Sequence, residues 1–305
     1  MRRKLRNIAA LAVLLFAATV RAESPAVERL TSDGHLKQRP VWSPDGQWLV
    51  FTRHEGATIF LFVRSADGKT ERRLTSHGNP EFDADWSPDG KRLVLAYDKA
   101  SPNQGDIDVN LVNLDGSDFK PLAGTDGKLS HEEWPSWSPD GNWIAFSSTR
   151  DDNQELYVVK PDGSDRKRLT TELAIDAHPA WSPDSKRIVF ATSRWGDLEL
   201  AVMNADGSGL VRLTESRGID DYPAWSADGK RIAFASNRDG NLEIYTIDPD
   251  GKNPRNETRH EAIDNFPSWR KDGRLTFVSN RDGGFDIYVA TPREATAAAD
   301  NQPDQ

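Results

Sequence analysis

Short runs with apolar residues at every second position recur along this chain, separated by clusters of turn residues. One unit has an extended run over 220–226, a strand-forming segment over 231–236 and an alternating segment over 242–247. Aspartate and glycine clusters divide these segments and predict β-hairpins, because glycine accepts a positive φ and aspartate bonds its own backbone. A fourth short run, clearest at 167–170 and 211–214, completes a four-stranded antiparallel meander.

Six copies of this unit follow one another, each marked by a tryptophan in a phrase close to Trp-Ser-Pro-Asp-Gly, at intervals of 44, 51, 44, 44 and 44 residues. A period of roughly 40 to 50 residues is typical of solenoids and propellers. A small sheet with two apolar faces must stack on its neighbours, as propeller blades do. The sequence therefore predicts an all-β, six-bladed β-propeller of four-stranded antiparallel blades. The tryptophans expected to pack as spacers between blades are Trp42, Trp86, Trp137, Trp181, Trp225 and Trp269.

The two ends of the array predict how the ring closes. The sixth copy has only three strands, since no fourth strand follows Pro292. The N-terminal segment 27–31 matches the fourth strand at 167–170, and we expect it to complete the last blade and remove an exposed sheet edge. The longer second interval predicts two insertions, over 98–105 and around 124–130, which we interpret as surface loops rather than binding segments.

The N-terminus has the layout of a secretory signal peptide. Residues 1–7 hold four basic residues, and the apolar run at 8–20 is shorter than the roughly 20 residues of a membrane span. A retained anchor is the alternative. We expect a signal peptide over 1–22, a periplasmic propeller over 23–292 that does not span a membrane, and a disordered polar tail over 293–305.

Charge and composition limit the kinds of partner that we expect this protein to bind. The first 22 residues carry five positive and no negative charges, so the formal net charge falls from −9 to −14 without them. An acidic body argues against nucleic acid, which is bound by clustered lysine and arginine, and leaves cations and basic partners open. The chain has no cysteine, which excludes disulfides, a thiolate nucleophile and zinc–thiolate sites. We expect a monomer.

Two motifs identify a family. Trp-Ser-Pro-Asp-Gly, together with Ser-Asn-Arg-Asp-Gly-Asn-Leu-Glu-Ile-Tyr at 236–245 and its echo at 279–288, resembles the TolB-type propeller repeat. The resemblance covers 27–291 and implies the propeller fold. The family's namesake has a separate domain before its propeller, which we expect this chain to lack. Similar propellers precede hydrolase domains in the prolyl oligopeptidase group, for which no residues remain here, and a related propeller forms oligogalacturonate lyases, whose channel holds a metal bound by histidines.

Comparison of the copies with one another predicts the functional positions. Five residues before the tryptophan, every copy except the first carries a carboxylate, where the first has Lys37. Such a ring at one mouth of the channel would hold a calcium-like cation or attract a basic loop of a partner. The alternative is local, because a carboxylate before a turn also caps loop backbone. The carboxylates are Glu81, Glu132, Asp176, Asp220 and Asp264.

Three residues before the tryptophan, the copies stop agreeing. A purely structural position could carry the same residue in every copy. Different residues in the six copies therefore predict a surface shaped for a ligand or partner. The residues are Arg39, Asp83, Trp134, His178, Tyr222 and Phe266.

Catalytic motifs are weak. The chain has no Gly-x-Ser-x-Gly elbow and no glycine-rich phosphate loop. We therefore expect a non-catalytic scaffold that binds an envelope protein or polymer, with no cofactor other than the calcium-like cation considered above. The alternative is a metal-dependent polysaccharide lyase or hydrolase, its metal lying in the channel near His131, His178 and the carboxylates.

Overall fold

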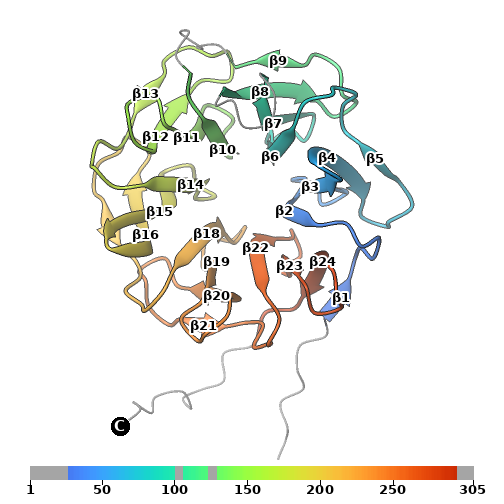
Figure 1. Cartoon of the computed structure of the whole chain (residues 1–305). Coiled ribbons are helices and arrows are strands. Elements are labelled where there is room, and N and C mark those ends of the chain that lie inside the picture. Colours follow the sequence, from blue (N-terminus) through green and yellow to red (C-terminus); the bar gives the residue numbers. More distant parts are fainter. Residues whose placement is uncertain (1–26, 100–105, 123–128, 294–305) are drawn as a thin grey trace, which may run out of the picture.

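The computed structural model describes residues 27–99, 106–122 and 129–293, which form six four-stranded antiparallel sheets around a central axis (Figure 1). The predicted all-β, six-bladed propeller is confirmed. Within these ranges there is no helix, and so none long and apolar enough to cross a membrane. The predicted signal peptide lies outside the described residues, as do most of both insertions and the polar tail apart from Arg293.

Five blades take four consecutive strands each, and the first strand of each blade lies nearest the axis (Figure 1). Their strands are β2 (Lys37–Trp42), β3 (Trp48–Glu55), β4 (Thr58–Ser65) and β5 (Glu71–Arg73); β6 (Glu81–Trp86), β7 (Arg92–Asp98), β8 (Ile107–Asn113) and β9 (Lys120–Pro121); β10 (Glu132–Trp137), β11 (Ile144–Ser148), β12 (Glu155–Val159) and β13 (Lys167–Arg168); β14 (Asp176–Trp181), β15 (Arg187–Trp195), β16 (Asp197–Asn204) and β17 (Val211–Arg212); β18 (Asp220–Trp225), β19 (Ile232–Ser236), β20 (Glu243–Ile247) and β21 (Arg255–Asn256). The sixth blade consists of β22 (Asp264–Trp269), β23 (Leu275–Ser279), β24 (Asp286–Ala290) and, as its outer strand, β1 (Val27–Arg29).

The repeated Trp-Ser-Pro-Asp-Gly phrase forms the turn between the first and second strands of a blade. In the first blade the Ser43 hydroxyl donates to Asp45 Oδ1 at 2.6 Å, and the same oxygen accepts from the backbone N–H of Gln47 at 2.9 Å. Gly46 has a φ of 74°, and Ser185 takes this place in the fourth blade with a φ of 58°. The aspartate bonds therefore hold the turn even where glycine, which best tolerates a positive φ, is absent.

The anchoring tryptophans pack where one blade meets the next. The indole N–H of Trp86 donates to the carbonyl oxygen of Val41, in the preceding blade, at 3.0 Å. Trp225 of the fifth blade shares a buried apolar cluster with Val189 and Leu200 of the fourth. The core thus lies between neighbouring sheets, in agreement with the predicted role of the tryptophans as spacers.

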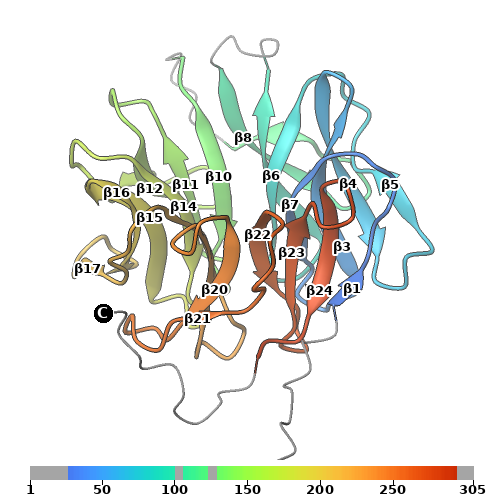
Figure 2. The same cartoon turned by 60° about the horizontal axis from the view of Figure 1, so that its bottom comes forward.

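The N-terminal segment takes the place of a fourth strand in the sixth blade. β1 pairs antiparallel with β24 along its whole length (Figure 2). Just beyond it, the Thr31 hydroxyl donates to Asp286 Oδ1 at 2.8 Å and accepts from the backbone N–H of Ile287 at 3.0 Å. In the fourth blade, the hydroxyl of Thr214 donates to Glu199 in the same way, at 2.5 Å. The N-terminal segment therefore repeats the contacts of an internal outer strand.

One carboxylate joins the two ends of the ring. Asp286 is fully buried, and it accepts hydrogen bonds from Arg29 in β1 at 2.6 Å and from Lys37 in β2 at 3.0 Å. Burial by itself would raise the pKa of Asp286, but the hydrogen bonds from Arg29, Lys37 and Thr31 outweigh it and lower the pKa. Asp286 is therefore ionised, and it binds the sixth blade to both β1 and the first blade.

We predict that Asp286→Asn destabilises the protein by about 3 kcal/mol, because Arg29 and the buried Lys37 ammonium lose the buried carboxylate that they share, and Lys37 keeps only the partly exposed carboxylate of Asp33 as an anionic partner. Urea unfolding monitored by tryptophan fluorescence measures the loss. The loss should shrink as the pH falls through the lowered pKa of Asp286, where the wild-type carboxylate also becomes neutral.

The matched control is Asp272→Asn, which removes a carboxylate that is 45% exposed and pairs with Arg274 at 3.0 Å. An exposed pair contributes about 1 kcal/mol or less. Equal losses in the two variants would show that Asp286 does not close the ring.

Candidate functional site

Every innermost strand is interrupted at the same place, where the residue three before the tryptophan has a left-handed backbone. The six φ values range from 45° to 54°, and none of the six residues is glycine. Pairing with the second strand shifts register there in all six blades. This conformation costs a bulky residue about 1 kcal/mol or more, and such bulges re-aim side chains. We call these residues the channel ring: Arg39, Asp83, Trp134, His178, Tyr222 and Phe266.

Four members of the channel ring form a continuous aromatic arc. The ring centroids of Trp134 and His178 lie 4.1 Å apart, those of His178 and Tyr222 4.1 Å, and those of Tyr222 and Phe266 4.6 Å. Each residue comes from a different blade, so the fold brings together side chains that lie 44 residues apart in sequence. The position at which the copies diverge is thus a single surface in the structure.

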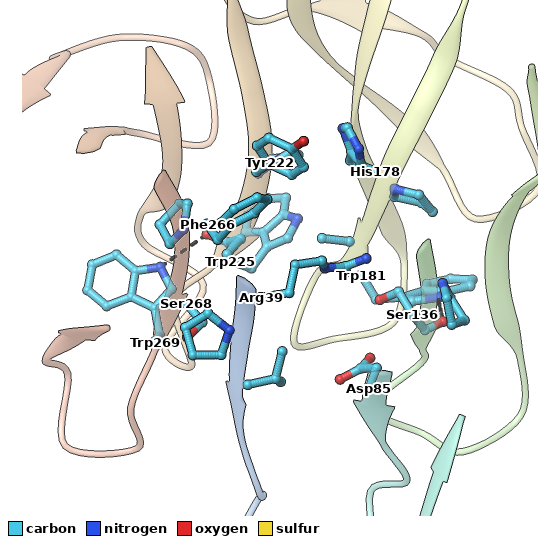
Figure 3. A pocket seen from close by; sticks show the side chains of 18 of the residues that line it. Arg39, Asp85, Ser136, His178, Trp181, Tyr222, Trp225, Phe266, Ser268 and Trp269 are labelled. Atoms are coloured by element: carbon cyan, nitrogen blue, oxygen red, sulfur yellow. Dashed lines mark hydrogen bonds between the residues drawn. The ribbon is translucent and has the colours of Figure 1, made fainter. Parts of the chain in front are cut away.

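The other two members make the ring charged on one side. Arg39 Nη1 lies 3.5 Å from Asp83 Oδ1, and Figure 3 shows Arg39 reaching into the space between the labelled side chains. Burial raises the pKa of Asp83, and the charge of Arg39 opposes that rise. Nearby, the two oxygens of Asp85 accept the backbone N–H groups of Trp86 and Trp137, at 2.8 and 2.7 Å. The charges of these two carboxylates are therefore compensated by an ion pair at Asp83 and by backbone donors at Asp85.

His178 is held by a carboxylate of the next blade. It is 7% exposed, and its Nδ1 lies 2.5 Å from Asp221 Oδ1, which also accepts the backbone N–H of Tyr222 at 2.8 Å. The contact fixes the orientation of the imidazole ring and leaves Nε2 as its free nitrogen. Nε2 is buried and has no hydrogen-bond partner among the described residues.

A cavity of about 230 Å³ occupies the channel between the channel ring and the anchoring tryptophans (Figure 3). The inner strands β2, β10, β14, β18 and β22 line it, and β6 contributes Asp85. The residue that follows each lining member of the channel ring is a proline: Pro40, Pro179, Pro223 and Pro267. The wall therefore alternates rigid apolar surfaces with a few polar groups, as small-molecule sites do.

Each carboxylate five residues before the tryptophan contacts a basic side chain nearby in the chain. Each of the last four pairs with an arginine that follows the second strand or ends it. The pairs are Glu132 with Arg150 (3.3 Å), Asp176 with Arg194 (2.6 Å), Asp220 with Arg238 (2.7 Å) and Asp264 with Arg281 (3.0 Å). Glu81 instead contacts His77 at 3.1 Å, and Lys37 contacts Asp286 at 3.0 Å. All six residues are buried. The five carboxylates have partners close to them in the chain, whereas Lys37 pairs across the junction between the first and sixth blades.

The residues considered for a metal do not converge. Across the described ranges, no group of three or more histidine, aspartate or glutamate side chains is placed to hold a metal ion. His131 is 42% exposed and lies 3.9 Å from Glu133, whereas His178 is bound to Asp221. Neither the calcium-like cation nor a metal bound by histidines finds its donor set in these residues.

Comparison of the copies at two repeat positions missed three acidic residues of the site. Four residues before the tryptophan, Glu133 and Asp221 are the only charged residues among six copies, and one residue before it Asp85 is the only one. A charge present in one or two copies where the others are neutral is the same kind of departure that identified the channel ring. Extending that comparison to every inner-strand position would have found them.

Comparison with known proteins agrees with the geometry. The family model for the TolB beta propeller domain matches residues 18–171, 104–222 and 211–299. The Tol-Pal system protein TolB of Syntrophus aciditrophicus is 40% identical over 58 residues, which is 19% of this chain and only 12% of that protein's length.

Solved structures show the same fold at low identity. The putative TolB of Agrobacterium tumefaciens superposes with a TM-score of 0.68 and 22% identity over 87% of this chain and 93% of that one. An oligogalacturonate lyase of Vibrio parahaemolyticus gives a TM-score of 0.59 and 13% identity over 90% and 95%. Because the matched segments of the family model run through nearly the whole propeller, this chain belongs to the TolB beta propeller domain family.

Proposed function

We propose that this protein is an exported, non-catalytic binding propeller of the periplasm, which captures a segment of an envelope protein at the channel ring. The observation that carries the proposal is the channel ring itself. Six strained backbone positions present six different side chains to one channel, while the rest of each blade repeats. Strain maintained in every blade around a variable surface is typical of a recognition site.

The chemistry of the mouth favours a segment with apolar and basic residues. Trp134, His178, Tyr222 and Phe266 offer a curved aromatic surface, and aromatic side chains are enriched at binding hot spots. Glu133 adds a carboxylate beside this arc, within an acidic chain. The family supports an envelope partner, since one relative is a Tol-Pal system protein.

A metal-dependent lyase or hydrolase is the less favoured function. Likeness to an oligogalacturonate lyase at 13% identity concerns the fold alone. The described residues supply no cluster of metal ligands, and His178 uses one ring nitrogen to bind Asp221. Stoichiometric manganese or zinc retained by the purified protein would contradict the non-catalytic proposal.

We predict that Trp134→Ala abolishes specific capture of an envelope protein, because it removes one end of the aromatic arc. The measurement is cross-linking of the purified full chain to an envelope extract, with quantification of the proteins recovered by wild type and variant. Leu173→Ala is the matched control, since Leu173 is fully exposed in the loop before β14 and is no part of the channel ring. Equal recovery by Trp134→Ala and wild type would refute the proposed role of the mouth.

We predict that Glu133 makes both stability and capture depend on pH. Burial raises its pKa from 4.5 to about 7, and the charges of Asp83 and Glu132 add to the rise. An acid with a raised pKa favours the folded state when protonated, so stability should fall as the pH increases from 4.5 through 7. Capture of a basic segment should strengthen over the same interval, as Glu133 becomes negative.

Glu133→Gln tests this prediction, because it keeps the shape of the side chain and removes the titration. The variant should be more stable than wild type above pH 7, by an amount on the order of 2 to 3 kcal/mol, and its capture should change less with pH. Parallel stability profiles of wild type and variant, measured by urea unfolding across this interval, would show that Glu133 titrates normally.

A further inference from the structure

Several residues that line the cavity beneath the channel ring hold buried polar atoms that make no hydrogen bond within the described part of the chain. Five of its lining residues each hold a buried nitrogen or oxygen without a hydrogen bond to any described residue. These residues come from five different blades, so the unpaired atoms are distributed around the channel axis. The atoms are Trp137 Nε1, His178 Nε2, Trp225 Nε1, Ser268 Oγ and Arg39 Nη1, of which Arg39 Nη1 has only its ion pair with Asp83 at 3.5 Å.

The unpaired indoles are a departure from the repeat. Trp86, Trp181 and Trp269 each donate their indole N–H to a carbonyl oxygen of the preceding blade, at 3.0 to 3.1 Å. Trp137 and Trp225 hold the same place in their blades without that bond. An unsatisfied buried donor costs about 1 to 3 kcal/mol, so several of them around one cavity indicate a polar occupant.

The charges around the cavity favour a neutral occupant. Arg39 is paired with Asp83 at 3.5 Å, and His178 is bound to Asp221 at 2.5 Å. Asp85 accepts two backbone N–H groups and has lone pairs left for a hydroxyl group. No lining cation lacks a nearby carboxylate, so nothing here specifically attracts an anion.

The size of the cavity and the chemistry of its wall further limit the class of molecule that could occupy it. The cavity of about 230 Å³ has room for roughly seven water molecules at about 30 Å³ each, which is small for a drug-sized ligand. Between the polar atoms, the wall is largely apolar: it includes proline rings, tryptophan rings and the side chains of Tyr222 and Phe266, both labelled in Figure 3. An occupant that suits this wall is a single ring with hydrogen-bonding groups around its edge and C–H groups on its faces.

We propose that this cavity binds one neutral sugar ring. Its hydroxyl groups point outward from the ring, and they both accept and donate hydrogen bonds, so they satisfy the indole, guanidinium and imidazole nitrogens and also donate to Asp85. Its C–H faces lie against the prolines and aromatic rings. The site goes beyond the proposed capture of a protein segment, which uses the outer face of the channel ring and Trp134, a residue that does not line the cavity.

The test uses the full mature protein with glucose, galactose and mannose, their methyl glycosides and glucuronate. Saturation-transfer NMR detects binding, and calorimetry measures the affinity. We expect at least one neutral sugar to bind with one-to-one stoichiometry and glucuronate to bind more weakly. Binding of the methyl glycoside as well as the free sugar would identify the end of a glycan chain as a ligand, and binding of the free sugar alone would identify a monosaccharide. Failure of every neutral sugar, or preference for glucuronate, would overturn the proposal.

Two matched variants separate hydrogen bonding from packing. Trp225→Phe removes an unpaired indole N–H, whereas Trp269→Phe removes one that is already bonded to the carbonyl oxygen of Ala224, at the same repeat position and in the same cavity. Trp225→Phe should weaken sugar binding about fivefold, the effect of one hydrogen bond, and Trp269→Phe should mainly lower the melting temperature.

Ser268→Ala provides a second variant with little risk to folding, and it should weaken binding by a similar factor. Equal affinities in wild type, Trp225→Phe and Ser268→Ala would overturn the assignment of these atoms to a ligand. The result is independent of the proposed protein capture, because it is measured on the purified protein with the sugar alone, and Leu173→Ala, which alters neither site, should leave sugar binding unchanged. Sugar binding measured in the absence of any envelope protein would therefore support the sugar site, and it would not bear on the capture of a protein segment.

Discussion

The need to bury both faces of every sheet is the constraint on which this molecule depends. A four-stranded blade has apolar side chains on both faces, so it is stable only between two neighbours. The tryptophans meet this need by packing across each junction, as Trp86 does when it bonds the backbone at Val41. Because every blade relies on the next, the junction between the two ends of the chain matters as much as any other. There the buried carboxylate of Asp286 binds Arg29 and Lys37. These ionic contacts hold together blades that the chain itself does not connect at this junction.

The same packing explains how the inner strands hold a strained conformation. Each inner strand is fixed at one end by the tryptophan and the turn after it, and at the other end, in the last four blades, by a carboxylate–arginine pair such as Asp220 with Arg238. Between these anchors lies the residue with positive φ. Its conformation is determined by the strand's ends rather than by its own side chain, which is why arginine, tryptophan and phenylalanine all adopt it. The framework thus fixes the backbone of the channel ring and leaves its chemistry free.

The sequence predicted most of the fold because its evidence is periodic. Each periodic feature corresponds to a contact within one blade or between neighbouring blades. These features are the spacing of the tryptophans, the turn residues and the resemblance of 27–31 to the outer strands of other blades. The channel ring was predicted as a divergent position, and the structure places its residues together. The ion-pair partners of the inner-strand carboxylates were not predicted. Asp176 bonds Arg194 eighteen residues later because the second strand returns antiparallel beside the first. An arginine recurs 17 or 18 residues after the carboxylate in four copies, so comparing the copies at that spacing as well would have revealed these pairs.

The two sides of the channel ring differ in chemistry. The first two blades contribute Arg39 and Asp83, while the following four contribute the aromatic arc that begins at Trp134. An occupant therefore meets charge on one side of the channel and apolar rings on the other, which is a difference that a six-fold repeat could not produce with identical copies. Since each residue belongs to its own blade, one substitution changes one sector and leaves the backbone of the others as it was. Specificity in such a propeller can therefore change one blade at a time without any change in the packing that holds the ring together.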